Sequence, residues 1–280
     1  MIIRCWGSRG SISVSGEQYV SYGGDTTCVE VVSKTGEIVI IDAGTGIRNL
    51  GNSLLKRGEK KYFILLSHCH WDHIQGISFF KPLLDKDVEL VVQDRNIAEV
   101  STRDIFKTVM TPPFFPIHWE DMTAKIRFDA RLARQNFSIG SLSIESIPTS
   151  HSQGTLGYKF SEDGKSFVFL TDNELGFDHP QGKGKEGYAR FAENADLLFH
   201  DAEYTKEEYL HRRGWGHSSI DDVLWLAQKA KVKTLGLIHL NQDRCDDEMD
   251  RIVDACNQEL RAKKCPTQCL AVSNTSEFTL

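Results

Sequence analysis

The chain contains 280 residues, of which 40% are hydrophobic and 26% charged, and its formal net charge is −6. This length suits one large domain or two small ones, and the composition is that of a globular protein with enough apolar residues for a core. Collagen-like, disordered and low-complexity classes are excluded. A chain with a pI near 5.9 also fits poorly with proteins that bind many phosphates of a long nucleic acid.

The ends of the chain and its cysteines bear on its location. No window approaches the run of about 18 apolar residues that a membrane helix needs, and the first residues lead into a strand-like segment rather than a signal peptide. The seven cysteines are odd in number and scattered, which favours reduced thiols over a disulfide framework. We therefore expect a cytoplasmic protein with no membrane partner.

Short runs of β-branched and aromatic residues alternate with helical periodicities along the chain. The runs predict strands at 27–32, 37–42, 62–66, 88–92, 142–147, 167–170, 196–199 and 234–239. Apolar residues at helical spacing predict helices at 47–55 and 249–260. Ser218 followed by Asp221 predicts a capping box that opens a further helix. No linker divides the pattern, so we expect one α/β domain over residues 1–280.

The most informative stretch is His68-Cys69-His70-Trp71-Asp72-His73, which directly follows an apolar run. In an extended chain His68, His70 and Asp72 project to the same side, because side chains alternate with a period of two. His73 then follows at a turn and faces the same cavity. Imidazole and carboxylate donors suit zinc, manganese or iron. Their spacing is too tight for all four to share one tetrahedral ion, which indicates two adjacent divalent ions.

Three other predicted strands also lead into a donor, namely His151, Asp172 and His239. Sites in open α/β sheets assemble at the carboxyl ends of strands. A lone histidine at such a place is usually a surface or core residue, but the nearby cluster favours a shared metal role. Together the five histidines and two aspartates supply seven donors, about the number that two ions and a bridging water need.

At these residues the sequence resembles the metallo-β-lactamase superfamily of dinuclear metallohydrolases, whose signature is the H-x-H-x-D-H motif. The resemblance covers nearly the whole chain and is greatest to the phosphodiesterase branch, which includes ribonuclease Z and bacterial cyclic-nucleotide phosphodiesterases. Matching segments outside the motif lie at 6–11, 23–28, 41–46, 148–151, 200–203 and 216–219. The resemblance implies a four-layer αββα sandwich with the metals at one sheet edge.

The same resemblance implies two metal sites that share a bridging ligand. One ion would be held by His68, His70 and His151. The other would be held by Asp72, His73 and His239. Asp172 would bridge the two ions, and Asp42 would fix the metal loop from behind.

His217 is the expected proton donor, because the resemblance places it beside the substrate phosphate or leaving group. Asp201 would orient it, and it stands where ribonuclease Z has Glu, which shortens the arm by one methylene. An imidazole with an ordinary pKa near 6.5 suits protonation of a leaving alkoxide. The alternative for His217 is packing at a helix N-terminus beside Ser218. We expect His217, Asp201 and Asp72 to be the catalytic residues.

The implied reaction is hydrolysis of a phosphodiester in a small or cyclic nucleotide. Two ions about 3.5–4 Å apart lower the pKa of a bridging water, and the resulting hydroxide attacks phosphorus in line. Zinc is the default metal, with manganese or iron as alternatives. Relatives in this branch are often dimers, so a homodimer is expected by analogy alone.

Three alternative functions follow from the same residues. A tRNA 3′-processing nuclease is disfavoured because the acidic chain has no Gly/Pro-rich basic arm. A hydrolase of a lactone, thioester or β-lactam is disfavoured by the 200–203 and 216–219 segments. A metal-holding scaffold without catalysis would predict a missing ligand, and none is missing from the sequence.

Two loops and one arginine leave their roles open. The 110–119 stretch holds three prolines and several aromatic residues, which would either stack on a nucleobase or form core or a dimer contact. The 179–187 stretch carries Lys183 and Lys185, and Arg9 lies near the N-terminus. Each of these cations would bind a phosphate or, as the simpler interpretation, lie on a solvated surface loop.

Overall fold

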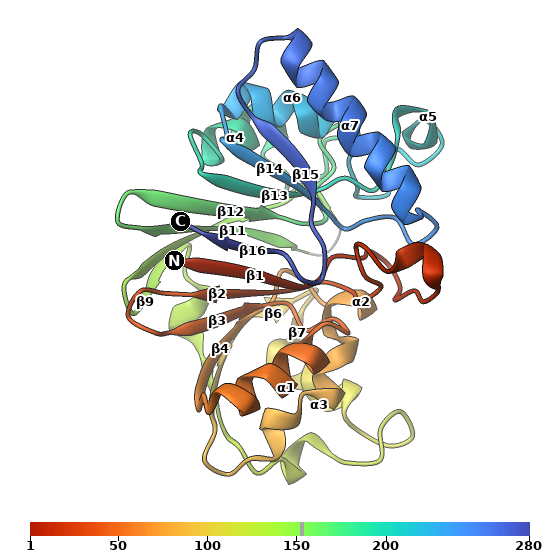
Figure 1. The fold of residues 1–280 in the computed structure, drawn as a ribbon. Helices are drawn as coiled ribbons and strands as arrows, with labels where there is room; N and C mark the ends of the chain where they lie inside the picture. The colour runs from red at the N-terminus through yellow and green to blue at the C-terminus, as the bar shows by residue number, and fades with distance from the viewer. Residues whose placement is uncertain (152–153) are drawn as a thin grey trace.

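The computed structural model describes residues 1–151 and 154–280. Within them, two seven-stranded sheets pack face to face between two outer layers of helices (Figure 1). The chain is therefore the four-layer α/β sandwich that the sequence predicted. None of its helices in the described ranges is both long enough and apolar enough to cross a bilayer.

The first sheet is formed by the N-terminal half of the chain and the last strand. Its order is β16 (Glu277–Thr279), β1 (Ile2–Gly7), β2 (Cys28–Val32), β3 (Ile38–Ile41), β4 (Lys61–Leu65), β5 (Glu89–Gln93) and β8 (Lys125–Asp129). From β3 to β8 the strands are parallel. Helices α1 (Ile47–Arg57) and α3 (Thr102–Val109) pack on its outer face, where their apolar residues share one buried cluster with the strands.

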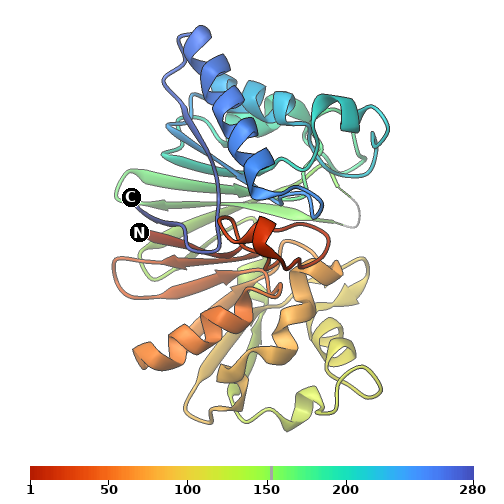
Figure 2. The ribbon, with the colours of Figure 1, turned by 45° about the vertical axis from the view of Figure 1, so that its right-hand side comes forward.

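The second sheet is formed by the C-terminal half. Its order is β15 (Gln268–Ala271), β14 (Thr234–Ile238), β13 (Leu197–Asp201), β12 (Lys165–Leu170), β11 (Leu156–Glu162), β10 (Leu142–Pro148) and β9 (Asn136–Ile139). Its outer face is covered by α4 (Gly184–Phe191), α6 (Ile220–Ala230) and α7 (Asp246–Ala262), as Figure 2 shows from a second side.

Short elements connect these layers. They are α2 (Trp71–Ile74), α5 (Lys206–Tyr209), the hairpin β6 (Asn96–Ile97) with β7 (Val100–Ser101), and 3₁₀ helices at Glu17–Tyr19, Gln75–Phe79, Lys81–Leu84, Trp119–Asp121 and Ala130–Ala133. The core between the sheets is apolar and aromatic. Phe167 of β12 meets Phe199 of β13 edge to face, with ring centroids 5.0 Å apart.

Strand direction places the metal donors at one edge of the molecule. β10 and β12 are both antiparallel to β11, and β12, β13 and β14 are parallel, so β10, β12 and β14 run the same way. Their carboxyl ends lead into His151, Asp172 and His239. The carboxyl end of β4, in the facing sheet, leads into the histidine motif, which brings both halves of the chain to the same place.

The eight strands and three helices predicted from the sequence are present, and the strand ends differ by at most two residues. The capping box was wrong by one position, because Ser219 caps α6 and accepts a hydrogen bond from Asp222 N. Ser218 is instead used by another loop, since its Oγ donates to Asn173 O and accepts from Leu175 N. The 179–187 loop is shorter than predicted, because α4 begins at Gly184.

Asp196 joins the starts of three strands of the second sheet. Its carboxylate accepts hydrogen bonds from Ser166 N, Lys165 Nζ and Lys233 Nζ. Burial disfavours the charged form, but the hydrogen bonds of Lys233 and Ser166 outweigh it and lower the pKa of Asp196. A lowered pKa stabilises the fold above the pKa of the unfolded chain, about 3.9, and this contribution is lost as the pH falls through the folded pKa.

We therefore expect Asp196→Ala to lower the free energy of unfolding at pH 7 by about 1–3 kcal/mol, the usual penalty for buried donors left unpaired. The difference from the unaltered protein should shrink as the pH falls below about 4. Urea unfolding at pH 7 and pH 3.5 measures both effects. The control is Asp163→Ala, because Asp163 forms an exposed ion pair with Lys34. Equal losses in the two variants at pH 7 would contradict the assignment.

Candidate metal centre

The histidine motif forms a loop and one helical turn rather than the extended segment that the sequence predicted. His70 is the N-cap of α2, so Asp72 and His73 both lie in that helix. A helical turn, unlike a strand, lets two consecutive residues face one centre. Asp72 Oδ2 is 3.1 Å from His73 Nε2, and both side chains are buried.

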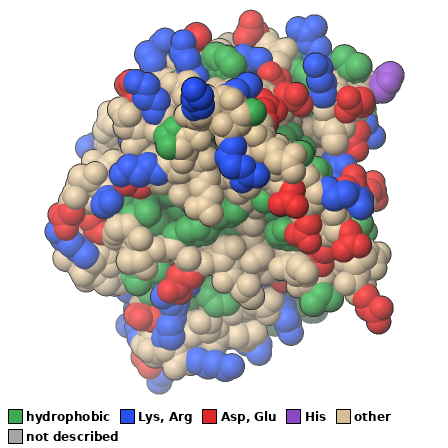
Figure 3. Space-filling model, turned by 45° about the horizontal axis from the view of Figure 1, so that its top comes forward, with side chains coloured by type: hydrophobic (Ala, Val, Ile, Leu, Met, Phe, Trp, Pro, Cys, Tyr) green, Lys and Arg blue, Asp and Glu red, His purple; other side chains and the backbone are tan. Residues whose placement is uncertain are grey.

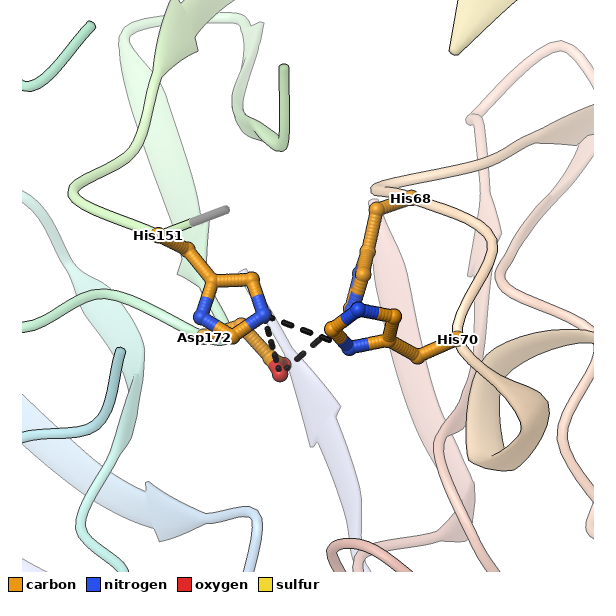
Figure 4. Close-up of side chains that lie close together, drawn as sticks. All are labelled: His68, His70, His151 and Asp172. Atoms are coloured by element: carbon orange, nitrogen blue, oxygen red, sulfur yellow. Dashed lines mark hydrogen bonds and ion pairs between the residues drawn. The ribbon is translucent and has the colours of Figure 1, made fainter. Parts of the chain in front are cut away.

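A first group of donors comes from both halves of the chain. Figure 4 shows the side chains of His68, His70, His151 and Asp172 pointing toward one another. One ligand atom of each lies within 4.8 Å of the others. His151 Nε2 is 3.3 Å from His70 Nδ1, and Asp172 Oδ2 is 3.6 Å from both His68 Nε2 and His151 Nε2.

A second group lies against the first and consists of Asp72, His73 and His239, again within 4.8 Å. His239 Nε2 is 3.2 Å from Asp72 Oδ2. Asp172 contacts this group as well, because its Oδ1 is 3.2 Å from His73 Nε2. The structure thus brings together all seven donors predicted from the sequence and places Asp172 between the two groups.

Carboxylates and a carbonyl hold the outer nitrogens of three imidazoles. Asp42 Oδ2 is 2.8 Å from His73 Nδ1, and both oxygens of this carboxylate also accept hydrogen bonds from Ser67. His151 Nδ1 donates to Gly216 O, which can only accept. In both residues the Nε2 lone pair is therefore left facing the centre, which is how metal-binding histidines are usually oriented.

Glu203 performs the same task for the third imidazole and was missed by the sequence analysis. Its Oε2 lies 2.9 Å from His239 Nδ1, and the side chain is buried. It belongs to the 200–203 segment that resembled ribonuclease Z, but nothing in that pattern assigned it a partner. Ser11 was also missed, and its backbone N donates to Asp72 Oδ2.

The donor set fits divalent metal ions. His68 Nε2 and His73 Nε2 are buried and have no hydrogen-bond partner in the described part of the chain. Burial lowers the pKa of His68, His70 and His151, the last to about 4, which keeps these imidazoles in the neutral form that binds metals. Nitrogen and carboxylate oxygen donors together suit zinc and other first-row ions.

His217 lies at the rim of this centre with its predicted partner. Its Nδ1 is 2.8 Å from Asp201 Oδ2, and its ring stacks on that of His239 with centroids 4.7 Å apart. Asp201 is itself fixed, because Oδ1 accepts from Glu203 N. Burial disfavours the charged imidazole, but the charge and hydrogen bond of Asp201 outweigh it and raise the pKa of His217 to about 9. The shorter aspartate arm therefore still reaches His217.

A buried carboxylate, Glu174, fixes the loop that precedes His217. Its Oε1 accepts from Tyr209 Oη and Gly214 N, and its Oε2 accepts from Gly216 N, all at 2.7 Å. His179 Nε2 is a fourth neighbour, 2.8 Å from Oε2. Since Gly216 O accepts from His151, Glu174 positions one metal-site imidazole and the approach to His217.

Glu174→Ala is expected to lower the free energy of unfolding by at least about 2 kcal/mol, because four donors lose a charged acceptor. It is also expected to lower kcat by roughly 10–100-fold, as for other residues that orient a metal ligand. Denaturant unfolding, metal content and kcat should be measured together. Glu193→Ala, which removes an exposed carboxylate, is the control. A kcat equal to that of the control would show that the loop needs no such anchor.

Two further candidates from the sequence have structural roles. Arg9 is fully buried and donates hydrogen bonds to the carbonyls of Gly23, Asn241 and Arg244. Both interpretations of Arg9, as a phosphate ligand and as part of a solvated surface loop, were therefore wrong. Lys185 contacts the carboxylate of Asp222 at the start of α6.

The aromatic residues of the 110–119 stretch divide between core and surface. Trp119 is buried against Phe106, and Phe115 packs edge to face on Phe79. Phe114 is 70% exposed. Core packing is thus the role of Trp119, as one of the two interpretations expected.

Comparison with known families and sequences gives a consistent result. Residues 37–240 match the family described as the β-lactamase superfamily domain. The ribonuclease Z of Thermococcus onnurineus is 25% identical over 247 residues, covering 73% of this chain and 76% of that protein. The ribonuclease Z of Thermococcus kodakarensis is also 25% identical and covers 73% of this chain and 75% of its own length.

Solved structures share the fold over almost the whole chain. The metallo-β-lactamase fold protein YhfI from Bacillus subtilis has a TM-score of 0.69 at 16% identity and covers 99% of this chain and 98% of its own. A diphosphatase from the PhnP family gives 0.67 at 18% identity, covering 100% and 97%. The short form of human tRNase Z gives 0.62 at 16% identity, covering 100% and 99%.

Proposed function

Since the chain belongs to the β-lactamase superfamily and has its metallohydrolase fold, we propose that it is a metal-dependent phosphodiesterase acting on a small or cyclic nucleotide. The observation that carries this proposal is the convergence of seven metal donors next to the His217–Asp201 pair. A hydrolase that needs only a metal-activated water has no evident use for a second, separately oriented imidazole. A reaction that expels a poor leaving group does.

In this proposal the seven donors hold two divalent ions, with zinc as the first choice and manganese or iron as alternatives. One ion would be held by His68, His70 and His151, and the other by Asp72, His73 and His239. Asp172 would be shared between them. Bound ions would supply Lewis acidity to the phosphoryl oxygens and would lower the pKa of the attacking water.

The protein's own groups then orient and move protons. Asp42 and Glu203 hold the outer nitrogens of His73 and His239, so that these rings cannot turn away. Asp201 accepts from His217 Nδ1, which leaves the Nε2 proton for the departing oxygen. Asp72, fixed by Ser11 N, keeps its carboxylate at the centre.

A small substrate is supported by the shape and charge of the molecule. The cavity beside His217 has a volume of about 310 Å³, near the lower limit of about 300–1,000 Å³ for small-ligand sites. Acidic and basic side chains are mixed over the face drawn in Figure 3, and the net charge is −6. A protein that grips a folded RNA normally offers a basic surface.

The second candidate is tRNA 3′-processing, and a specific observation favours it. Two relatives of the chain, each 25% identical and covering 73% of it, are named ribonuclease Z. The diphosphatase among the structural neighbours favours the small-substrate alternative at comparable fold similarity. Both proposals use the same metal centre. They differ in the part of the substrate that is bound outside this centre.

Elemental analysis and a substrate panel test the proposal. We expect about two divalent ions per chain and chelator-sensitive hydrolysis of bis-p-nitrophenyl phosphate. Cyclic mononucleotides, cyclic and linear dinucleotides and a precursor tRNA follow at equal concentration. Faster cleavage of precursor tRNA than of any nucleotide would transfer the assignment to the second candidate. Absence of metal-dependent hydrolysis would reject both.

A further inference from the structure

The cavity beside His217 is lined by three segments of the chain, at Ser11, at 203–217 and at 241–243. It is lined on the inner side by Ser11, Glu203 and His217, which contact or support the centre. Its outer side is lined by Tyr204, Arg212 and Trp215 among others. A substrate whose scissile phosphate lies at the metals would therefore extend into this cavity with the group on one side of that phosphate.

Arg212 places a free positive charge in the cavity. Its guanidinium lies 5.3 Å from the centre of the Tyr204 ring and donates to one carbonyl, Glu208 O, at 3.4 Å. No carboxylate lies within ion-pair distance of it in the described part of the chain. Three carboxylates line the cavity, and each has another partner. Glu208 pairs with Arg244, Glu203 with His239, and Asp243 accepts a hydrogen bond from Gln242 Nε2. An unpaired guanidinium facing a cavity is suited to a phosphate.

Trp215 presents an indole at the mouth of the same cavity. Its side chain is 65% exposed. The backbone of the loop that carries it is anchored, because Glu174 accepts hydrogen bonds from the backbone N of both Gly214 and Gly216. An exposed aromatic ring on an anchored loop next to a cation is suited to stacking on a nucleobase.

We propose that this cavity is a nucleotide subsite, in which the base next to the scissile bond stacks on Trp215 and Arg212 holds a second, non-scissile phosphate. The inference rests on the proposed phosphodiesterase function and narrows its substrate class. A cyclic mononucleotide has one phosphate, which the metals would occupy, and leaves Arg212 without a partner. Linear or cyclic dinucleotides, which carry two phosphates, satisfy both contacts.

Kinetic comparison of two substrates separates the subsite from the metal centre. The variants are Trp215→Ala and Arg212→Ala, with Arg213→Ala as control, because Arg213 lies over Phe177 instead of lining the cavity. We expect both subsite variants to lose about tenfold or more in kcat/KM on the linear diadenylate pApA. On methyl p-nitrophenyl phosphate, which has no base and no second phosphate, all three should match the unaltered protein.

Binding supplies a readout that does not depend on turnover. Calorimetric titration of the purified protein with adenosine and with AMP tests the two contacts separately. Trp215→Ala should weaken both ligands about tenfold, whereas Arg212→Ala should weaken AMP alone. Unchanged binding and unchanged pApA kinetics in both variants would overturn the subsite while leaving the phosphodiesterase function intact. Side-chain-dependent nucleotide binding with no hydrolysis of either diester would keep the subsite and reject the function.

Discussion

The Asp172→Ala variant is expected to lose metal and hydrolytic activity together. The carboxylate of Asp172 approaches both donor groups, because Oδ1 is 3.2 Å from His73 Nε2 and Oδ2 is 3.6 Å from His68 Nε2. Without this carboxylate the two proposed ions would lose their shared anionic ligand, and Asp72 would be the one carboxylate left among the proposed donors. We expect kcat/KM on bis-p-nitrophenyl phosphate to fall by more than about 100-fold, which exceeds the effect of losing a residue that only orients a ligand.

The measurement is metal content by elemental analysis beside the rate, with circular dichroism as the check on folding. Asp172→Asn keeps the side-chain volume and removes the negative charge. If the charge is what holds the metals, this variant should lose almost as much metal and activity as Asp172→Ala. Asp163→Ala removes an exposed carboxylate elsewhere and should leave both readings unchanged. An Asp172→Ala protein that retains two ions and its full rate would show that Asp172 is not a ligand.

The donors of the centre could be predicted from sequence because each follows an apolar strand. A strand that ends in a histidine or aspartate is visible without any knowledge of contacts, and parallel strands bring such ends to one edge. The resemblance to the metallo-β-lactamase superfamily, which the family match confirms, then linked the separate donors. The local geometry of the motif could not be predicted as well, since Asp72 lies in a helical turn that the motif does not indicate.

The residues that hold the donors in place were largely hidden. Glu174 and Glu203 act through contacts with segments far along the chain, and an isolated acid in sequence carries no sign that it will be buried. The burial of Arg9 was hidden for the same reason, because its partners are backbone carbonyls of residues 23, 241 and 244. Long-range contacts of this kind need the fold before they can be recognised.

The edge strands and the inner strand β11 were the part of the fold that sequence patterns missed. The edge strands β9, β15 and β16 are short, and β8 and β11 mix polar with apolar residues. Their pairing is stabilised by neighbours rather than by a distinct apolar run. None of these strands leads into one of the seven donors, so the site could be predicted more completely than the fold.

The second large effect is expected for His217→Ala. If His217 protonates the leaving oxygen, its removal should lower kcat on a dinucleotide by about 10²–10⁴-fold, the usual contribution of a general acid. Metal content should stay unchanged, since the seven donors are all retained. Asp201→Asn should produce a smaller loss, because the imidazole remains but its Nδ1 partner is no longer an anion.

The leaving group distinguishes acid catalysis from a packing role. p-Nitrophenolate departs without a proton, so His217→Ala should be impaired far less on bis-p-nitrophenyl phosphate than on a dinucleotide whose leaving group is an alkoxide. A side chain that only packs against His239 would slow both substrates alike, and His211→Ala, which removes an exposed imidazole, supplies the baseline. Equal loss on the two substrates, or an unchanged rate on the dinucleotide, would therefore reject acid catalysis by His217. It would favour a packing role before α6 instead.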